Sequence, residues 1–371
     1  MPAPTISYLT DIHFSPGSVT LLKDVLEERG LRRPLLVTDA GIMSAGLTER
    51  LPVPMAAVFE RTSGNPSAAD VTAAGKLYQA AACDCVVALG GGSPMDCAKA
   101  VALMATHAGP LEQYALIRGG LNRISHQKPP VIAIPTTSGT GSEVGRAALI
   151  TFDATTKVAI VGKPMIPDIA ICDPELTLGL PADLTAATGM DAISHCIETF
   201  CSPKFNPVAD AIALDGLQRA VTHLRIAVED GSNIQARSEM MMASMQGALA
   251  FQKGLGMIHS LSHPLGAIPK RLHHGTLNSI FVPHVLRYNA SHCPTAMNRM
   301  ATVIRCPASE LPDWFHSLAL DMGLPDRLAD LGVEQSDLDP LADAAIADHS
   351  TATNPAPMTT EDCATMYTAA L

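Results

Sequence analysis

The sequence predicts an N-terminal α/β domain, a parallel sheet with helices on both faces, followed by an all-α C-terminal domain. Three observations lead there. The chain has 371 residues, which is too long for one small core. Short β-branched runs alternate with helical stretches in the first half, and strand-like runs become rare after about residue 180. Pro181 interrupts the pattern at this point, so we place the domains at 1–180 and 181–371.

Four apolar runs in the first half predict buried strands. They cover residues 33–39, 85–90, 131–137 and 147–152, and each ends in or is followed by Gly, Asp, Thr or Ser. Helical patterns lie between them, as expected for a parallel sheet, whose ligands bind at the carboxyl ends of its strands.

Helix formers dominate the second half, for example in residues 184–200 and 238–251. The latter stretch contains a methionine cluster, which we expect to fill the core: Met240, Met241, Met242 and Met245.

Composition excludes several classes of protein. Aromatic residues make up 4% and the net charge is -11, which argues against a nucleic-acid partner. No apolar run reaches the length of a membrane span, and the N-terminus lacks the pattern of a secretory signal. The nine cysteines are scattered without a CxxC pair, as expected for reduced, buried thiols. We therefore expect a cytoplasmic protein.

Residues 85–105 read as a strand, a glycine loop and a helix. Gly90, Gly91 and Gly92 remove side chains where the backbone could approach a ligand. Ser93 is a good helix N-cap and Asp96 stands three residues later, as in a capping box. The free N–H groups of such a turn form an anion site, and a pyrophosphate would suit it. The loop is not GxGxxG, so the standard Rossmann fingerprint is absent.

Two further loops at predicted strand ends suit the same ligand. Residues 135–143 are rich in hydroxyls and glycines, which can bond a ribose or a nicotinamide amide. Asp39 follows the first strand, where a carboxylate can accept from both ribose hydroxyls and repel a 2′-phosphate. Together the three loops predict a bound dinucleotide, NAD rather than NADP.

The helical half contains a set of metal-ligating residue types. Asp191 and His195 are four residues apart, which puts both on one helix face, and His259 and His263 repeat this spacing. The pair 273–274, both histidines, follows about ten residues later. Clustered imidazoles with one carboxylate match Fe(II), Zn(II), Ni(II) or Co(II).

These residues lie in a series of motifs that resembles the group III iron-containing alcohol dehydrogenases. The series covers nearly the whole chain: LLVTDAG, GNPSAADV, GGGSPMDCAKA, PTTSGTGSEV, DPELTLGLP, TGMDAISHCIE, GLGMIHSLSHPLGA and HHGTLN. The resemblance implies a nucleotide-binding α/β domain, a helical metal-binding domain, an active site in the cleft between them, and a homodimer or larger homo-oligomer.

The resemblance also implies roles for individual residues. The implied metal ligands are Asp191, His195, His259 and a histidine followed by glycine, which is His274. Extra residues (IPKRLH) before this point keep His273 open as the alternative. His263 matches a histidine near the metal that does not bind it, and it is a candidate proton relay. The implied cofactor contacts are Asp39, Asn65, Gly91, Gly92, Ser93, Asp96, Thr136, Thr137 and Lys157.

The expected activity is interconversion of a short-chain alcohol and its aldehyde by hydride transfer with NAD, the metal acting as a Lewis acid. Alternatives are a glycerol dehydrogenase-like or maleylacetate reductase-like member of the superfamily, or a catalytically silent NAD-binding protein. Lys270, Arg271 and Arg146 could receive a substrate carboxylate. The HHGTLN segment looks like the 4-hydroxybutyrate dehydrogenase branch, so we favour an ω-hydroxy acid.

Overall fold

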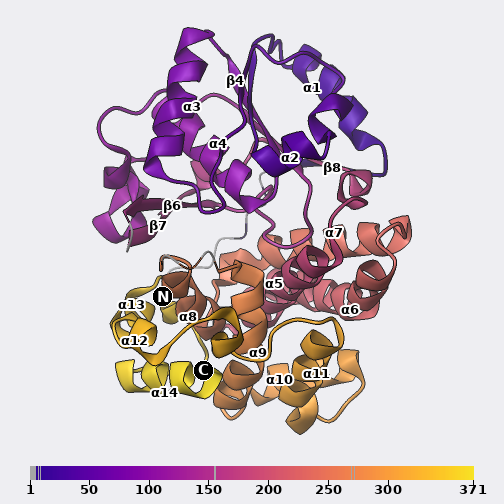
Figure 1. Cartoon of the computed structure of the whole chain (residues 1–371), viewed down its shortest axis with the longest axis vertical. Coiled ribbons are helices and arrows are strands. Elements are labelled where there is room, and N and C mark those ends of the chain that lie inside the picture. Colours follow the sequence, from indigo (N-terminus) through magenta and orange to yellow (C-terminus); the bar gives the residue numbers. More distant parts are fainter. Residues whose placement is uncertain (1–5, 7, 9, 154–155, 269, 271) are drawn as a thin grey trace. The chain divides into compact units, whose positions relative to one another are not determined.

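The computed structural model describes the chain apart from residues 1–5, 7, 9, 154–155, 269 and 271. It forms two compact units (Figure 1). One consists of Tyr8–Thr137 and Gly141–Gly179, and the other is formed mainly by Leu180–Leu371 and includes Ser138–Thr140.

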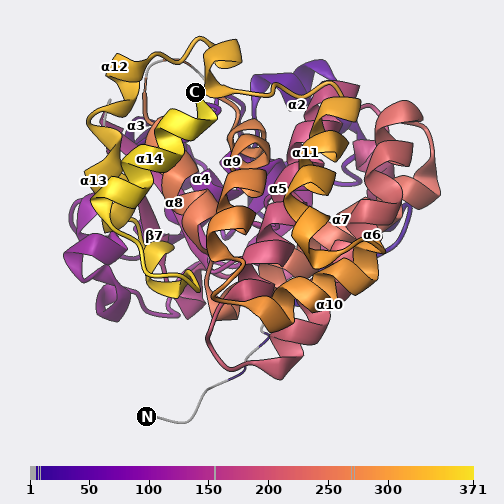
Figure 2. The same cartoon turned by 90° about the horizontal axis from the view of Figure 1, so that it is seen from below.

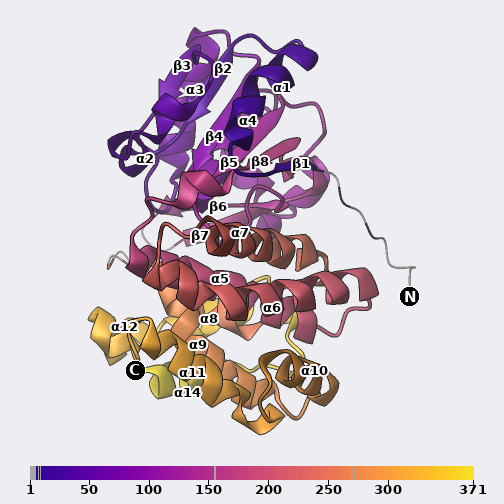
Figure 3. The ribbon, with the colours of Figure 1, turned by 90° about the vertical axis from the view of Figure 1, so that its right-hand side faces the viewer.

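The first unit is built on a six-stranded, fully parallel sheet (Figure 3). In spatial order its strands are β1 (Asp11–Phe14), β8 (Ile169–Cys172), β5 (Val131–Pro135), β4 (Cys85–Gly90), β2 (Pro34–Val37) and β3 (Ala57–Phe59). Strands β2, β4, β5 and β8 are buried along their whole length, because both faces of the sheet are covered.

Alternate side chains of the sheet enter two separate apolar clusters, one on each face. Leu35 of β2 packs with Val71 and Val101, from helices α3 (Ala68–Ala80) and α4 (Gly92–Met104). Leu36, the next residue, packs with Leu22 of helix α1 (Leu22–Glu28). The short helix α2 (Ala40–Ser44) follows β2. The predicted α/β architecture with helices on both faces is confirmed.

One predicted strand has a different partner from the one expected. Strand β6 (Ala147–Asp153) pairs antiparallel with β7 (Thr156–Val161) in a separate two-stranded sheet. Only two residues separate these strands, whereas a parallel crossover needs a dozen or more. The apolar run at 147–152 was therefore correctly predicted as a strand but wrongly placed in the parallel sheet.

The second unit is helical (Figure 2). Its helices are α5 (Ala182–Cys201), α6 (Pro207–Glu229), α7 (Ile234–Leu249), α8 (Met257–Leu265), α9 (His274–Asn289), α10 (Pro294–Ile304), α11 (Leu311–Asp321), α12 (Gln335–Leu338), α13 (Leu341–Ala347) and α14 (Thr360–Ala370). Helix α5 is central, since every residue from Thr185 to Cys201 is buried. Met240, Met241 and Met245 are buried as expected, whereas Met242 is half-buried. Among the described residues, no helix is long and apolar enough to cross a membrane.

Candidate functional site

Three helices of the second unit bring a carboxylate and three imidazoles together. Asp191 and His195 lie on α5, His259 lies on α8, and His274 is the first residue of α9. The Nε2 atoms of His195, His259 and His274 lie 3.5, 3.7 and 3.6 Å from Oδ1 of Asp191. The side chain of His274 is 28% exposed and the other three are almost fully buried, so the cluster is open on one side only.

The local sequence explains how α9 comes so near α5. Gly275 follows His274 directly, and a Cβ atom on it would lie 2.1 Å from the carbonyl oxygen of Ala187. A residue with a side chain would therefore push α9 away from α5. Glycine at this position lets His274 reach Asp191, whereas the neighbouring His273 is exposed.

Outer contacts fix the tautomer of two of the imidazoles. Nδ1 of His195 lies 3.2 Å from the carbonyl oxygen of Gly139, and Nδ1 of His259 lies 2.5 Å from Oε2 of Glu198. Both partners are acceptors, so Nδ1 carries the hydrogen in each ring. The Nε2 atom of each ring is then left to bind a cation, either a metal ion or a proton.

The side chain of Asn278 lies among the polar atoms at the centre of the cluster. Nδ2 of Asn278, on α9, lies 2.7 Å from Asp191 Oδ1, 3.3 Å from His259 Nε2 and 3.2 Å from His274 Nε2. Within the described residues Oδ1 of Asn278 has no hydrogen-bond partner at all. A divalent cation at this point would lie among Oδ1 of Asp191 and the Nε2 atoms of the three imidazoles, and three nitrogens with one carboxylate oxygen suit a borderline transition metal.

The pKa values of the cluster also indicate a site for positive charge. Burial alone would raise the pKa of Asp191, but His195, His274 and His259 hold it well below its usual range. Burial lowers the pKa of His195 to about 4, so that this ring is neutral at pH 7. Although burial opposes it, the charge of Glu198, with that of Asp191, raises the pKa of His259 to about 9.

A second group of donors lies beside the first and includes His263. Its Nδ1 lies 2.9 Å from Oδ2 of Asp348, and Nδ1 of His349 lies 3.5 Å from Oδ1 of the same carboxylate. The ring of His263 stacks on that of His274, with centroids 5.3 Å apart. Asp348 therefore holds His263 with Nδ1 protonated, next to the open side of the cluster.

Sequence reasoning missed Glu198 and Asn278, whose side chains make hydrogen bonds to the cluster. A signal was available for both. Glu198 is three residues after His195, and Asn278 is four after His274, so each shares a helix face with an expected ligand. Glu198 is 4% exposed and Asn278 is fully buried.

In the first unit, the three predicted loops follow neighbouring strands. Asp39 follows β2, Gly91–Ser93 follow β4, and Thr136–Thr137 follow β5, and these strands are adjacent in the sheet. Their carboxyl ends share one edge, which is where ligands of parallel sheets bind. Asn65 and Lys157 also meet, since the Lys157 ammonium donates to Oδ1 of Asn65 at 2.7 Å.

Two details of the glycine loop differ from the prediction. Gly91, not Ser93, is the N-cap of α4, and the Ser93 hydroxyl donates to the carbonyl oxygen of Gly64 at 2.6 Å. Asp96 does not complete a capping box, because its carboxylate accepts from the Ser142 hydroxyl and the Leu149 N–H. A helix begun by glycine leaves its first N–H groups without a side-chain acceptor, so the capacity to bind an anion is kept.

Asp39 itself is the N-cap of α2, since its Oδ1 accepts the N–H of Ile42 at 3.0 Å. Thr136 is 2% exposed, and its hydroxyl has no hydrogen-bond partner within the described residues.

Comparison with known proteins gives matches over both units. Residues 10–174 match the family model of iron-containing alcohol dehydrogenases, and residues 185–371 match that of the C-terminal region of the same family. The chain is 51% identical to 4-hydroxybutyrate dehydrogenase of Cupriavidus necator, over 94% of this chain and 95% of that protein.

Solved structures agree with these matches. A 1,3-propanediol oxidoreductase superimposes with a TM-score of 0.93 at 33% identity, over 99% of this chain and 100% of the other. Sulfoacetaldehyde reductase from Bifidobacterium kashiwanohense, solved in complex with NAD+, superimposes with a TM-score of 0.90 at 30% identity, over 100% of this chain and 99% of the other.

Proposed function

Because the chain belongs to the iron-containing alcohol dehydrogenase family, we propose that it interconverts a short ω-hydroxy acid and its semialdehyde with NAD. It is an oxidoreductase acting on CH–OH groups. Its 51% identity to a 4-hydroxybutyrate dehydrogenase supports this class of substrate over a plain alcohol. We further propose a cytoplasmic homodimer or larger homo-oligomer, with residues 1–180 as the nucleotide-binding domain and 181–371 as the catalytic domain.

The observation that carries the proposal is the cluster of acceptors around Asp191. We propose that Asp191, His195, His259 and His274 hold one divalent ion. Iron is the first candidate and zinc is the alternative. When bound, this ion supplies Lewis acidity and the nicotinamide supplies the hydride acceptor or donor. The protein holds both in place and keeps water from all but the side of His274, the one partly exposed ligand.

His263 is the residue we propose to move the hydroxyl proton. Because Asp348 accepts the hydrogen of its Nδ1, its Nε2 is free to take a proton from a substrate hydroxyl. Burial lowers the pKa of His263 and so keeps the ring neutral and able to accept. Asp348 acts through His263 and is a positioning residue.

For the cofactor, we propose that the N–H groups at the start of α4, with Gly91, Gly92 and Ser93, bind the pyrophosphate. Asp39 would bind the ribose hydroxyls. The remaining proposed contacts of the cofactor are Asn65, Asp96, Thr136, Thr137 and Lys157.

Three basic residues are proposed to bind the substrate carboxylate, and the structure describes the contacts or burial of two of them. The Lys270 ammonium is engaged, since it lies 3.0 Å from Oδ2 of Asp337 and donates to the Gly332 carbonyl oxygen. Arg271 lies outside the described residues. Arg146 is half-buried, and burial lowers the pKa of its guanidinium. Arg271 and Arg146 are the two residues whose replacement we propose as a test.

The test is alcohol-dependent formation of NADH by the purified protein with added Fe(II), together with its metal content. We expect one metal ion per chain and activity that a chelator removes. Changing Asp191, His195 or His259 to Ala should abolish both, because each change removes one ligand. Full metal content in His259→Ala would overturn the assignment.

A further inference from the structure

The helix that carries His259 begins without a side-chain cap of its own. Its N-cap is Gly256, and the helix has nine residues, with Pro264 inside it. A helix this short has little stability in isolation, and its first N–H groups are left without intrahelical acceptors. Here those N–H groups are buried, so acceptors from elsewhere in the chain must meet them.

Two distant side chains provide these acceptors. The Met257 N–H donates to Oδ1 of Asn354 at 3.1 Å, across 97 residues of sequence. The Ile258 N–H donates to Oε1 of Glu198 at 2.6 Å, and the other oxygen of Glu198 bonds the His259 ring. The first three residues of α8 are thus each held by a buried side chain from outside the helix.

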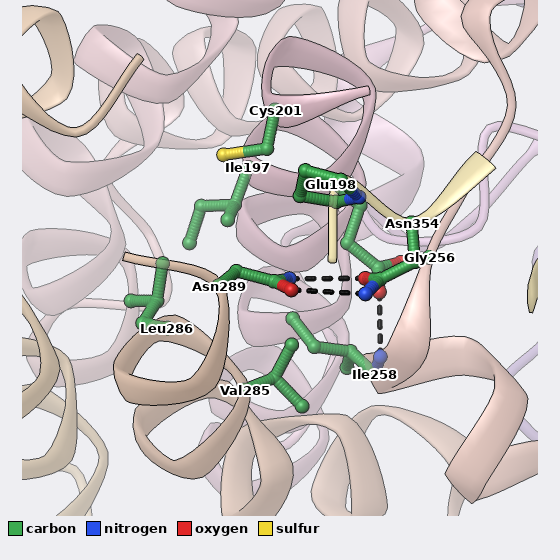
Figure 4. A pocket seen from close by; sticks show the side chains of 10 residues that line it. Ile197, Glu198, Cys201, Gly256, Ile258, Val285, Leu286, Asn289 and Asn354 are labelled. Atoms are coloured by element: carbon green, nitrogen blue, oxygen red, sulfur yellow. Dashed lines mark hydrogen bonds between the residues drawn. The ribbon is translucent and has the colours of Figure 1, made fainter. Parts of the chain in front are cut away.

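Asn354 is in turn held by Asn289, at the end of α9 (Figure 4). The two amides form a reciprocal pair, in which each Nδ2 donates to the other Oδ1 at 2.9 Å. Nδ2 of Asn354 also donates to the carbonyl oxygen of Ala356 at 2.9 Å. Because that donation fixes which atom of Asn354 is nitrogen, its oxygen must face Met257. Glu198, Gly256, Asn289 and Asn354 line one small pocket.

The chain around residue 354 runs along the start of α8, and two glycines make room for it. The Thr353 hydroxyl donates to the carbonyl oxygen of Leu255 at 2.6 Å. A Cβ on Gly254, whose φ is +84°, would lie 2.3 Å from that hydroxyl oxygen. A Cβ on Gly256 would lie 2.9 Å from Oδ1 of Asn354. The close approach of residues 353–354 to α8 therefore requires both glycines.

We propose that Asn354, anchored by Asn289, is a positioning residue that sets the place of His259 within the metal cluster. This inference rests on the metal site proposed above. His259 is the third residue of α8, so a shift of the first turn moves its Nε2 atom relative to Asp191. Partners that orient a metal ligand are commonly worth roughly 10–100-fold in metal affinity.

The experiment measures Co(II) affinity of the full-length apoprotein by competition with a chelator, and the d–d absorption bands of the loaded protein. Asn354→Ala removes the acceptor of the Met257 N–H, and we expect Co(II) binding roughly 10–100-fold weaker with altered bands. Asn289→Ala leaves the acceptor but removes its anchor, so a smaller loss in the same direction is expected.

The matched control is Asn206→Ala. Asn206 is 6% exposed and caps α6, its Oδ1 accepting the Ala209 N–H at 3.1 Å. It is thus a buried cap of a helix that carries no proposed ligand. This variant should lose thermal stability but keep the Co(II) affinity and bands of the wild type.

Wild-type affinity and bands in Asn354→Ala, or an equal loss of affinity in Asn206→Ala, would overturn the positioning role. If Asn354→Ala does not fold, Asn289→Ala decides by the same criteria. A wild type that binds no Co(II), or His259→Ala binding as the wild type does, instead contradicts the proposed metal site itself.

Discussion

The carboxylate of Glu198 bonds the ring of His259 at one oxygen and the backbone N–H of Ile258 at the other. One side chain on α5 thus fixes both the place and the tautomer of a proposed ligand on α8. Such carboxylate–histidine pairs make the ring a better ligand, because the carboxylate favours positive charge on it.

Glu198→Gln tests this relationship. Glutamine can still accept the Ile258 N–H through its oxygen, but its NH2 group then faces Nδ1 of His259 and requires that atom to be unprotonated. The tautomer of the ring changes, and we expect metal affinity to fall roughly 10–100-fold. Isothermal titration of the apoprotein with Zn(II) measures it. Unchanged affinity would mean that Glu198 serves only the fold.

His274 should be the fourth ligand and His273 should not. His274→Ala removes an imidazole 3.6 Å from Asp191, so metal-dependent activity should disappear. His273→Ala changes an exposed residue and should leave metal content and activity as in the wild type. Metal analysis with the activity assay decides between them, and the reverse result would move the ligand by one residue.

The wild type should prefer NAD to NADP because of the charge on Asp39. A 2′-phosphate beside this carboxylate meets like-charge repulsion. Asp39→Asn keeps an oxygen that can accept from Ile42 and removes only the charge, so it should narrow the gap in kcat/KM between the cofactors. Equal use of NADH and NADPH by the wild type contradicts this role.

A carboxylate-binding site predicts higher kcat/KM for 4-hydroxybutyrate than for 1-butanol. If Arg271 or Arg146 binds the carboxylate, its change to Ala should cost roughly 1.5–3 kcal/mol for the acid, the usual worth of a hydrogen bond to a charged group. Turnover of butanol in the same variant is the control and should not change. Equal or better use of butanol by the wild type would mark a plain alcohol dehydrogenase.

Stability should depend on pH through Glu143, which is 2% exposed. Burial raises its pKa from 4.5 to about 7, although Lys99 opposes the shift. Because the folded-state pKa is the higher one, the stabilising effect is complete below the unfolded pKa and is lost as pH rises through about 7. Glu143→Gln stays neutral. Raising the pH from about 5 to about 8 should therefore lower the free energy of unfolding of the wild type by roughly 2–3 kcal/mol relative to that of Glu143→Gln.

Urea unfolding at several pH values measures this difference. Glu49→Gln, at an exposed position, is the control and should follow the wild type. A difference between Glu143→Gln and the wild type that does not vary with pH would contradict the ionisation of a buried carboxyl.

The sequence predicts those parts of the fold and site that depend on local pattern. Strands β2, β4 and β5 were found because their apolar runs are buried on both faces. Asp191 and His195 share a face of α5, as their i,i+4 spacing predicts. The spacing does not place His259, which the fold brings beside them from α8. Pairing of β6 with β7 was missed, since an apolar run does not reveal its partner strand.

Other features could not be found in this way. Ser93 has the residue type of an N-cap, but its hydroxyl instead reaches Gly64, 29 residues away. Asn289 and Asn354 are 65 residues apart, and neither belongs to a periodic pattern or lies near a ligand in sequence. Side chains that act through such long-range contacts become visible only when the chain is folded.

The distance of Asn354 from the ligands has a consequence for biosynthesis. All four proposed donors have been translated once residue 274 leaves the ribosome, whereas Asn289 and then Asn354 follow later. With the positioning role proposed above, a nascent chain has the donors before it has the geometry, and an ion captured then is held loosely and exchanges. If Asn354 has that role, tight binding of the ion requires a chain that has been synthesised and folded as far as residue 354.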